Sequence, residues 1–215
     1  MQRNRETSFD ANCSACPRLA GFLATARRAY PGYYCRPVPP FGDAQPELLI
    51  VGLAPGLHGA NRTGRPFTGD HAGLLLYETL HEFGYADRPT SVAADDGLTL
   101  TGCRITNAVK CVPPGNKPEP AEIRHCNGYL QAELAALESR VRLLALGQVA
   151  HGAILKAQGL KLRDYRFGHG AAHVLPDGRR LYDSYHCSRY NTQTRRLTPE
   201  MFKAVFAQIH TERGY

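Results

Sequence analysis

Four cysteines, in two pairs far apart in the sequence, constrain the fold of this chain more than any other feature. Cys13 and Cys16 form a close pair near the start, whereas Cys111 and Cys126 have fourteen residues between them. Four soft thiolates close the coordination sphere of a zinc ion or of an iron–sulfur cluster. The two segments are therefore expected to meet at one metal centre. A closed sphere has no open position for a substrate, so we expect that centre to be structural and the chemistry to lie elsewhere.

Length and charge set broad limits. A chain of 215 residues suits a single domain over residues 1–215, and no apolar run is long enough for a membrane span. The polar N-terminus leads into no apolar signal core, so a cytoplasmic location is expected, where the seven cysteines stay reduced. The protein is also expected to be a monomer. Lys and Arg total 26 against 19 acidic residues. This basic balance suits a polyanionic partner but does not identify it.

Short apolar runs alternate with amphipathic segments along most of the chain. Alternation of this kind predicts parallel strands joined by right-handed helical crossovers. The expected fold is a three-layer α/β/α sandwich with a central, mainly parallel four-stranded sheet. The predicted strands span residues 47–53, 104–109, 141–146 and 180–185, and the predicted helices span residues 17–30, 71–84, 120–139, 148–158 and 199–210. In such sheets ligands bind at the carboxyl ends of the strands.

The segment after the first predicted strand, residues 52–70, is rich in glycine and polar side chains. Its spacing matches neither the GxxxxGK[ST] nor the GxGxxG phosphate-binding pattern, so we interpret it as a pocket wall. An aromatic residue such as Phe67 usually packs in the core. Its Pro, Thr and Gly neighbours instead favour a loop position, where the ring can stack on a base. Asp70 is placed to cap the following helix, and its carboxylate can still accept a hydrogen bond from water.

Two further polar segments follow later strands. Asn107 ends the second strand, where its amide either binds a loop backbone or offers a donor and an acceptor to a base edge. Strand alternation puts Lys110 on the opposite face, which disfavours Schiff-base chemistry. His186 directly follows the last strand and opens a Ser-, Arg- and Asn-rich loop. A single histidine is more often structural, but this position is where an α/β sheet presents side chains to a ligand.

Together these segments resemble the uracil-DNA glycosylase superfamily, specifically its fifth family, the type-b iron–sulfur enzymes. The resemblance is carried by GLAPG–HG–NRTGRPFTGD, by SYHxSxxNTQT–RLT, and by the cysteine pairs with TNAVKCVPP between the motifs. It extends from Cys13 to Thr198. It implies an α/β/α sandwich whose [4Fe–4S] cluster is held by four cysteines in the segments 13–16 and 111–126. Zinc stays open as the alternative metal.

The resemblance also implies an activity, namely hydrolysis of the N-glycosidic bond of uracil, and of other deaminated or damaged bases, in DNA. The product is an abasic site, and the expected partner is duplex DNA with uracil mismatches. Relatives in the fourth family carry an acidic residue directly after the strand glycine, where this chain has Leu53 followed by Ala54. The resemblance implies that Asp70 takes its place. Many relatives have proline where this chain has Cys187.

The implied roles divide the candidate residues into three groups. Asp70 holds the attacking water, His186 donates to the base O2, and Asn107 binds the base edge. The expected substrate contacts are Gly52, Ala54, Phe67, Asn107, Ser188 and Asn191, and the expected DNA contacts are Arg62, Arg65, Arg189 and Tyr190. Two alternatives come from other classes. One is a zinc-stapled nucleic-acid-binding module without catalysis. The other is a small-molecule hydrolase or nucleotide-binding α/β enzyme, whose activity would not depend strongly on DNA or salt.

Overall fold

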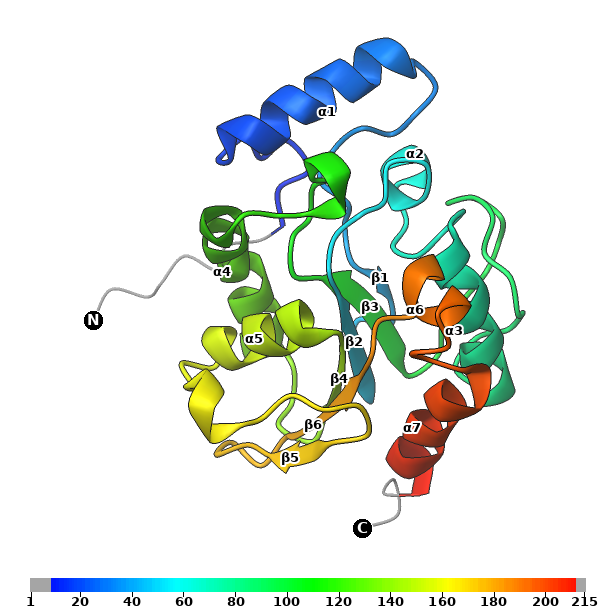
Figure 1. The fold of residues 1–215 in the computed structure, drawn as a ribbon, viewed down its shortest axis with the longest axis vertical. Coiled ribbons are helices and arrows are strands. Elements are labelled where there is room, and N and C mark those ends of the chain that lie inside the picture. Colours follow the sequence, from blue (N-terminus) through cyan, green and yellow to red (C-terminus); the bar gives the residue numbers. More distant parts are fainter. Residues whose placement is uncertain (1–8, 212–215) are drawn as a thin grey trace.

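A six-stranded sheet forms the centre of the molecule (Figure 1). The computed structural model describes residues 9–211; the polar start of the chain, on which the expected compartment rests, lies outside this range. The strand order is β1-β3-β2-β4-β6-β5. The strands are β1 (Phe41–Gly42), β2 (Leu48–Gly52), β3 (Cys103–Asn107), β4 (Arg142–Leu146), β5 (Ala172–Val174) and β6 (Arg180–Ser184). The inner four are parallel, and β1 and β5 pair antiparallel at the edges.

The four parallel strands are the four predicted from the sequence. The prediction of a four-stranded sheet was wrong because it missed both edge strands. With two and three residues, β1 and β5 are too short to show the alternation that identifies a strand. Both are fixed by pairing with a longer neighbour instead.

Helices cover both faces of the sheet, which confirms the three-layer α/β/α architecture. In Figure 1, α4 and α5 lie on one face and α3, α6 and α7 on the other. The helices are α1 (Pro17–Ala29), α2 (Ala60–Thr63), α3 (His71–Glu82), α4 (Pro120–Ala136), α5 (Gln148–Ala157), α6 (Arg189–Gln193) and α7 (Pro199–Thr211), with 3-10 turns η1 (Pro114–Asn116) and η2 (Leu162–Asp164). The single-turn α2 and the five-residue α6 occupy segments that were predicted to be loops.

Apolar residues on the strands pack alternately into two separate cores. Leu48 and Ile50 of β2 pack in the core formed with α3 and α7, whereas Leu49 and Val51 pack in the core formed with α4 and α5. All four are completely buried. A strand covered on both sides needs an uninterrupted apolar run, and each such side chain contributes about 1.5–3 kcal/mol of burial free energy.

The register of the sheet brings the ends of the four parallel strands together. Gly52 at the end of β2 pairs with Asn107 at the end of β3, and Leu146 of β4 pairs with Ser184 of β6. The segments that follow these strands therefore leave the sheet at the same edge. Within residues 9–211, no helix combines the length and the apolar character required to cross a membrane.

Candidate active site

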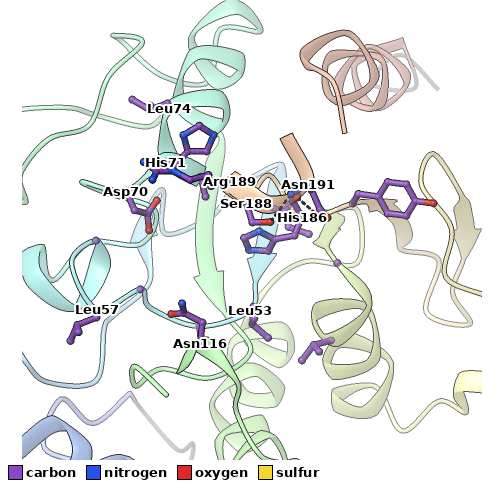
Figure 2. A pocket seen from close by; sticks show the side chains of 18 of the residues that line it. Leu53, Leu57, Asp70, His71, Leu74, Asn116, His186, Ser188, Arg189 and Asn191 are labelled. Atoms are coloured by element: carbon purple, nitrogen blue, oxygen red, sulfur yellow. Dashed lines mark hydrogen bonds between the residues drawn. The ribbon is translucent and has the colours of Figure 1, made fainter. Parts of the chain in front are cut away.

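A cleft of about 1010 Å³ opens at the carboxyl edge of the parallel strands. Its lining includes Asp70, His186 and Arg189, and Figure 2 shows Asp70 and His186 projecting toward the same space. A smaller cavity of about 30 Å³ is lined by Phe67, Asp70, Asn107 and His186 and shares several of its walls with the cleft. The structure thus brings the three predicted catalytic side chains and the predicted stacking ring together.

Phe67 is buried in an unusual backbone conformation. Its φ of 54° lies in the left-handed region, and its ring stacks on His186 with centroids 5.8 Å apart and an interplanar angle of 26°. The preceding residue is anchored, since the Tyr77 hydroxyl donates to the Pro66 carbonyl at 2.8 Å. A left-handed phenylalanine costs about 1–3 kcal/mol and persists only where the surroundings over-determine it. Here the conformation turns the ring into the cavity.

Gly52 allows the cavity to exist. A Cβ on Gly52 would lie 2.4 Å from Asn107 Oδ1 and 2.6 Å from the Phe67 ring. Both contacts are far inside van der Waals separation, so any side chain at this position would displace the two groups. Gly52 therefore contributes to the site because its missing side chain leaves room for Asn107 and Phe67. Ala54 lines both the cleft and the cavity.

Asp70 combines a structural and a chemical position. Its Oδ1 accepts from the Gly73 amide at 3.0 Å and caps α3, as predicted. Its Oδ2 lies against Gly59, where a Cβ would come within 2.4 Å. Burial raises the pKa of Asp70, although the Gly73 and Ala72 amides partly oppose this. One oxygen holds the helix, and the other remains for a ligand or a water.

His186 and Asn107 present unpaired polar atoms to the cavity. Within residues 9–211, neither His186 Nδ1 nor Asn107 Oδ1 finds a hydrogen-bond partner, although both atoms are buried. Burial lowers the pKa of His186 to about 4, so its ring is neutral near pH 7. The Asn191 side chain fixes the loop by donating to the His186 carbonyl at 2.8 Å. Buried polar groups without partners cost about 1–3 kcal/mol each, which points to a ligand that completes them.

Three of the four residues that were predicted to contact DNA are exposed, and the fourth, Arg65, is buried. Arg62, Arg189 and Tyr190 are exposed, Tyr190 to 70%, and Arg189 lines the cleft. Ser188 and Asn191, which were predicted to contact the substrate, line the cleft beside Arg189, and Ser188 caps α6 by accepting from the Asn191 amide. Arg62 and Tyr190 lie at the surface outside the lining of the cleft.

Arg65 does not fit its predicted role as a DNA contact. Its side chain is only 5% exposed and forms an ion pair with Asp96 at 2.7 Å. The same guanidinium donates to Ser91 Oγ and the Ala94 carbonyl, and it lies 4.4 Å from the Phe41 ring centroid. Because its donors are engaged inside the protein, Arg65 braces the loop after α3 against the NRTGRPF segment. This corrects the prediction.

His71, which the sequence did not single out, joins the wall of the cleft, whereas Lys110 does not. His71 Nε2 contacts Thr192 Oγ1 at 2.9 Å and so links the start of α3 to α6. The only sequence signal for His71 was its place directly after Asp70. Lys110 is buried, contacts Thr106 Oγ1, and lies 3.5 Å from Glu133, so it lines neither the cleft nor the cavity.

Comparison with known proteins gives the family. The model of the "Uracil DNA glycosylase superfamily" matches residues 39–210, which include the whole site. The chain belongs to the uracil-DNA glycosylase superfamily. A "Type-5 uracil-DNA glycosylase" of Thermus thermophilus is 48% identical over 91% of each chain. Proteins of the same name from Mycobacterium leprae and Pyrobaculum aerophilum are 46% and 41% identical, over 90% and 94% of this chain and 88% and 90% of their own.

In this member of the uracil-DNA glycosylase superfamily, the four cysteines lie close to one another, as predicted. Cys16, Cys111 and Cys126 pack in one small cluster with Leu19 and Val109. Burial, together with the charges of the other three thiols, raises the pKa of Cys111 to about 12. Thiols held this close in buried surroundings suit a bound metal centre, which requires all of them as thiolates.

Among the residues that the structure describes, His151, His173 and Asp183 are the set of three potential ligand atoms that all lie within 4.8 Å of one another. No three of the cysteine sulfurs in this part of the chain meet that criterion.

Proposed function

We propose that this chain hydrolyses the N-glycosidic bond of uracil in DNA and leaves an abasic site. Its similarity to type-5 uracil-DNA glycosylases over most of the chain supports this activity. The observation that carries the proposal is the shared cavity, which is lined by Phe67, Asp70, Asn107 and His186. One chain supplies all four groups, so we also propose that it acts as a monomer and as one domain over residues 1–215.

The extruded base would bind in the cavity at the floor of the cleft. Phe67 would stack on the base, and Asn107 would hydrogen-bond its edge through the atom that now has no partner. Flipping a nucleotide costs a few kcal/mol and is cheapest at a mismatch, which favours duplex DNA with U·G pairs as substrate. A cavity of about 30 Å³ must widen on binding, and the adjoining cleft provides that space.

His186 would stabilise negative charge on the departing base. As the bond breaks, charge grows on the base O2, and an N–H donor there is comparable to an oxyanion-hole donor, which contributes about 2.7–4 kcal/mol. With a pKa of about 4, His186 donates as a neutral imidazole. A neutral donor avoids burying a cation in an apolar site when no substrate is bound.

Asp70 would hold the attacking water and offset positive charge on the sugar. Its Oδ1 is engaged by the cap, which leaves Oδ2 for these tasks. We propose simple hydrolysis without strand cleavage, because Lys110, the lysine beside the pocket strand, is held by Thr106 and Glu133. Other deaminated or damaged bases are included in the proposal as further substrates.

The exposed basic residues would hold the DNA. Arg62 and Arg189 would contact phosphates, and Tyr190 would fill the gap left in the base stack. The formal net charge of +7 supports this partner. A binding site on the carboxyl edge of the sheet also agrees with the general location of ligands in α/β folds.

We propose a structural [4Fe–4S] cluster on Cys13, Cys16, Cys111 and Cys126. When bound, the cluster would cross-link the N-terminal segment to α4 and to the strand end that carries Asn107. The Lys110 amide, which donates to Cys126 Sγ at 3.2 Å, supports the assignment, because backbone amides commonly hydrogen-bond to ligating sulfur. Iron analysis and visible absorbance of the purified protein test it. Zinc without iron would contradict it.

Asp70→Asn tests the proposed activity most cleanly. Asparagine keeps an oxygen that can cap α3 but loses the charge, so the fold and DNA affinity should persist. The single-turnover excision rate on a U·G duplex should fall by about 10²–10⁴-fold. Asp70→Ala also loses the cap, worth about 1 kcal/mol of stability, and serves as the matched comparison. An undiminished rate in Asp70→Asn would remove Asp70 from the mechanism.

A further inference from the structure

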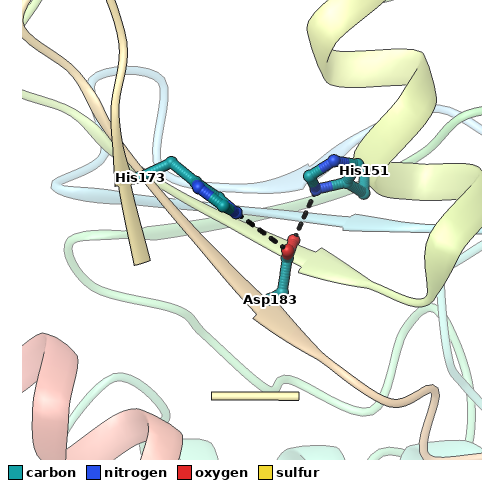
Figure 3. A group of neighbouring side chains, drawn as sticks. All are labelled: His151, His173 and Asp183. Atoms are coloured by element: carbon teal, nitrogen blue, oxygen red, sulfur yellow. Dashed lines mark hydrogen bonds and ion pairs between the residues drawn. The ribbon is translucent and has the colours of Figure 1, made fainter. Parts of the chain in front are cut away.

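Three side chains on one face of the sheet, outside the cleft, converge on a single point (Figure 3). His151 comes from α5, His173 from β5 and Asp183 from β6. Their ligand atoms all lie within 4.8 Å of one another, and none of the three residues lines the cleft or the small cavity. His151 and Asp183 are buried, whereas the side chain of His173 is 17% exposed.

The hydrogen bonds of His151 indicate that a positive charge belongs at this point. His151 Nε2 contacts the Tyr165 carbonyl at 2.9 Å, and a carbonyl can only accept, so Nε2 carries the hydrogen. In a neutral imidazole the other nitrogen is then an acceptor. Yet His151 Nδ1 lies 2.8 Å from Asp183 Oδ1, which is also an acceptor. Either a proton or a metal ion must lie between these two atoms.

A proton explains the contact between His151 and Asp183 but not the contact between His173 and Asp183. It would pair His151 Nδ1 with Asp183 Oδ1 but would leave Asp183 Oδ2 3.4 Å from His173 Nε2. Within residues 9–211, neither of these two buried atoms has a hydrogen-bond partner. Asp183 is completely buried, and an unsatisfied carboxylate oxygen in such a place is costly. A cation would satisfy both carboxylate oxygens and both imidazoles at once.

The geometry suits a metal ion. Bonds of about 2.0–2.2 Å place neighbouring donors about 3–3.5 Å apart, and the two nitrogen–oxygen distances are 2.8 and 3.4 Å. The hydrogen bond from His151 Nε2 to a backbone carbonyl is the outer contact that metal-bound histidines make. Two imidazoles and a carboxylate are donors typical of zinc and related ions. We propose that His151, His173 and Asp183 bind a divalent transition-metal ion, with Zn²⁺ as the reference ion.

This ion would join three elements behind the reaction site. It would tie α5 and the edge strand β5 to β6, and Asp183 lies three residues before His186 in the same run of chain. The rings of Tyr165 and Phe167 pack against the two histidines and shield the cluster. The exposure of His173 at the sheet edge gives the ion a route in. We therefore assign the site a structural role, distinct from the cysteine centre.

Metal uptake by the whole protein tests the site. The protein is treated with a chelator and then dialysed against Zn²⁺ or Co²⁺. Metal analysis before and after each step measures how much metal the cysteine centre holds. Wild type should take up one additional ion per chain, and Zn²⁺ should raise its Tm. His173→Ala should lose this ion and the rise in Tm, because it removes one ligand at a tolerant edge strand. His210→Ala, which removes a histidine from the exposed end of α7, should behave as wild type.

Cobalt identifies the ligands. Co²⁺ in the proposed site should show visible bands of nitrogen and oxygen ligation without the intense sulfur charge-transfer absorption of thiolate ligands. Asp183→Asn should abolish these bands even if its stability also changes. Absence of the extra ion in wild type, equal uptake by His173→Ala, or sulfur charge-transfer absorption would each overturn the proposal.

Discussion

Glycines, as much as charged side chains, give the pocket its form. Gly52 leaves room for Asn107 and Phe67, and Gly59 leaves room for the Asp70 carboxylate. Each glycine lies against a residue with a proposed catalytic or binding role. A methyl group at either position would move that residue while changing no charge.

Gly52→Ala should therefore reduce activity through shape alone. A Cβ would meet Asn107 Oδ1 and the Phe67 ring at 2.4 and 2.6 Å, so both must shift by roughly an ångström. A displacement of that size costs about 10²-fold in rate. We expect single-turnover excision to fall by about this factor while DNA affinity stays the same. Gly21→Ala, in α1 with open space around it, is the control and should keep full activity.

The protonation state of His186 gives a second prediction at this scale. Burial lowers its pKa to about 4, so the ring should stay neutral from pH 8 down to pH 5. An unfolded histidine binds a proton near pH 6.5, so this residue lowers the stability of the fold as the pH falls from about 6.5 toward 4. A ring-nitrogen NMR titration measures this directly. A midpoint near 6.5 would contradict a desolvated donor.

Between elements, buried polar contacts hold the walls of the cleft. His71 on α3 contacts Thr192 on α6, and Arg65 joins the NRTGRPF segment to Asp96 in the loop after α3. Burial alone would raise the pKa of Asp96, but hydrogen bonds from Arg65 and from backbone amides hold it well below the ordinary range. The ion pair therefore contributes its full stability at pH values above the ordinary pKa of an aspartate. This contribution is lost as the pH falls toward the lowered pKa of Asp96.

Arg65→Met should destabilise the fold without weakening DNA binding directly. Removing one partner of a buried pair leaves an uncompensated charge and costs about 3–5 kcal/mol. We expect urea unfolding at pH 7 to show a loss of this size, and the difference from wild type should shrink in acid as Asp96 protonates. Arg62→Met at the exposed neighbouring position should do the reverse: unchanged stability and weaker DNA binding. Equal stability of Arg65→Met and wild type would contradict this assignment.

The same elements show what the sequence could predict. The four parallel strands were predictable because burial on both faces demands continuous apolar runs, and Asp70, Asn107 and His186 were predictable because strand ends and a helix cap fix their positions. Arg65 was not, since its partner Asp96 lies in a distant loop and arginine is usually exposed. Likewise His151, His173 and Asp183 meet only through the pairing of β5 with β6 and the packing of α5.

For the whole molecule, separate parts of the chain have separate tasks. The four parallel strands end at one edge of the sheet, Cys16, Cys111 and Cys126 pack together between the N-terminal region and α4, and the exposed Arg189 and Arg196 line the cleft. In this arrangement the proposed catalytic groups lie at the ends of strands and at the start of a helix. The proposed roles require that a flipped uracil occupies the space between these ends.

The structure of the protein bound to duplex DNA with a non-hydrolysable uracil nucleotide, 2′-fluoro-2′-deoxyuridine, opposite guanine tests this claim most directly. We expect the base to leave the helix and to stack on Phe67. Its edge should lie within hydrogen-bond distance of Asn107 and its O2 within reach of His186, with a water on Asp70. A uracil that remains stacked in the duplex, or that binds away from these four side chains, would contradict the account.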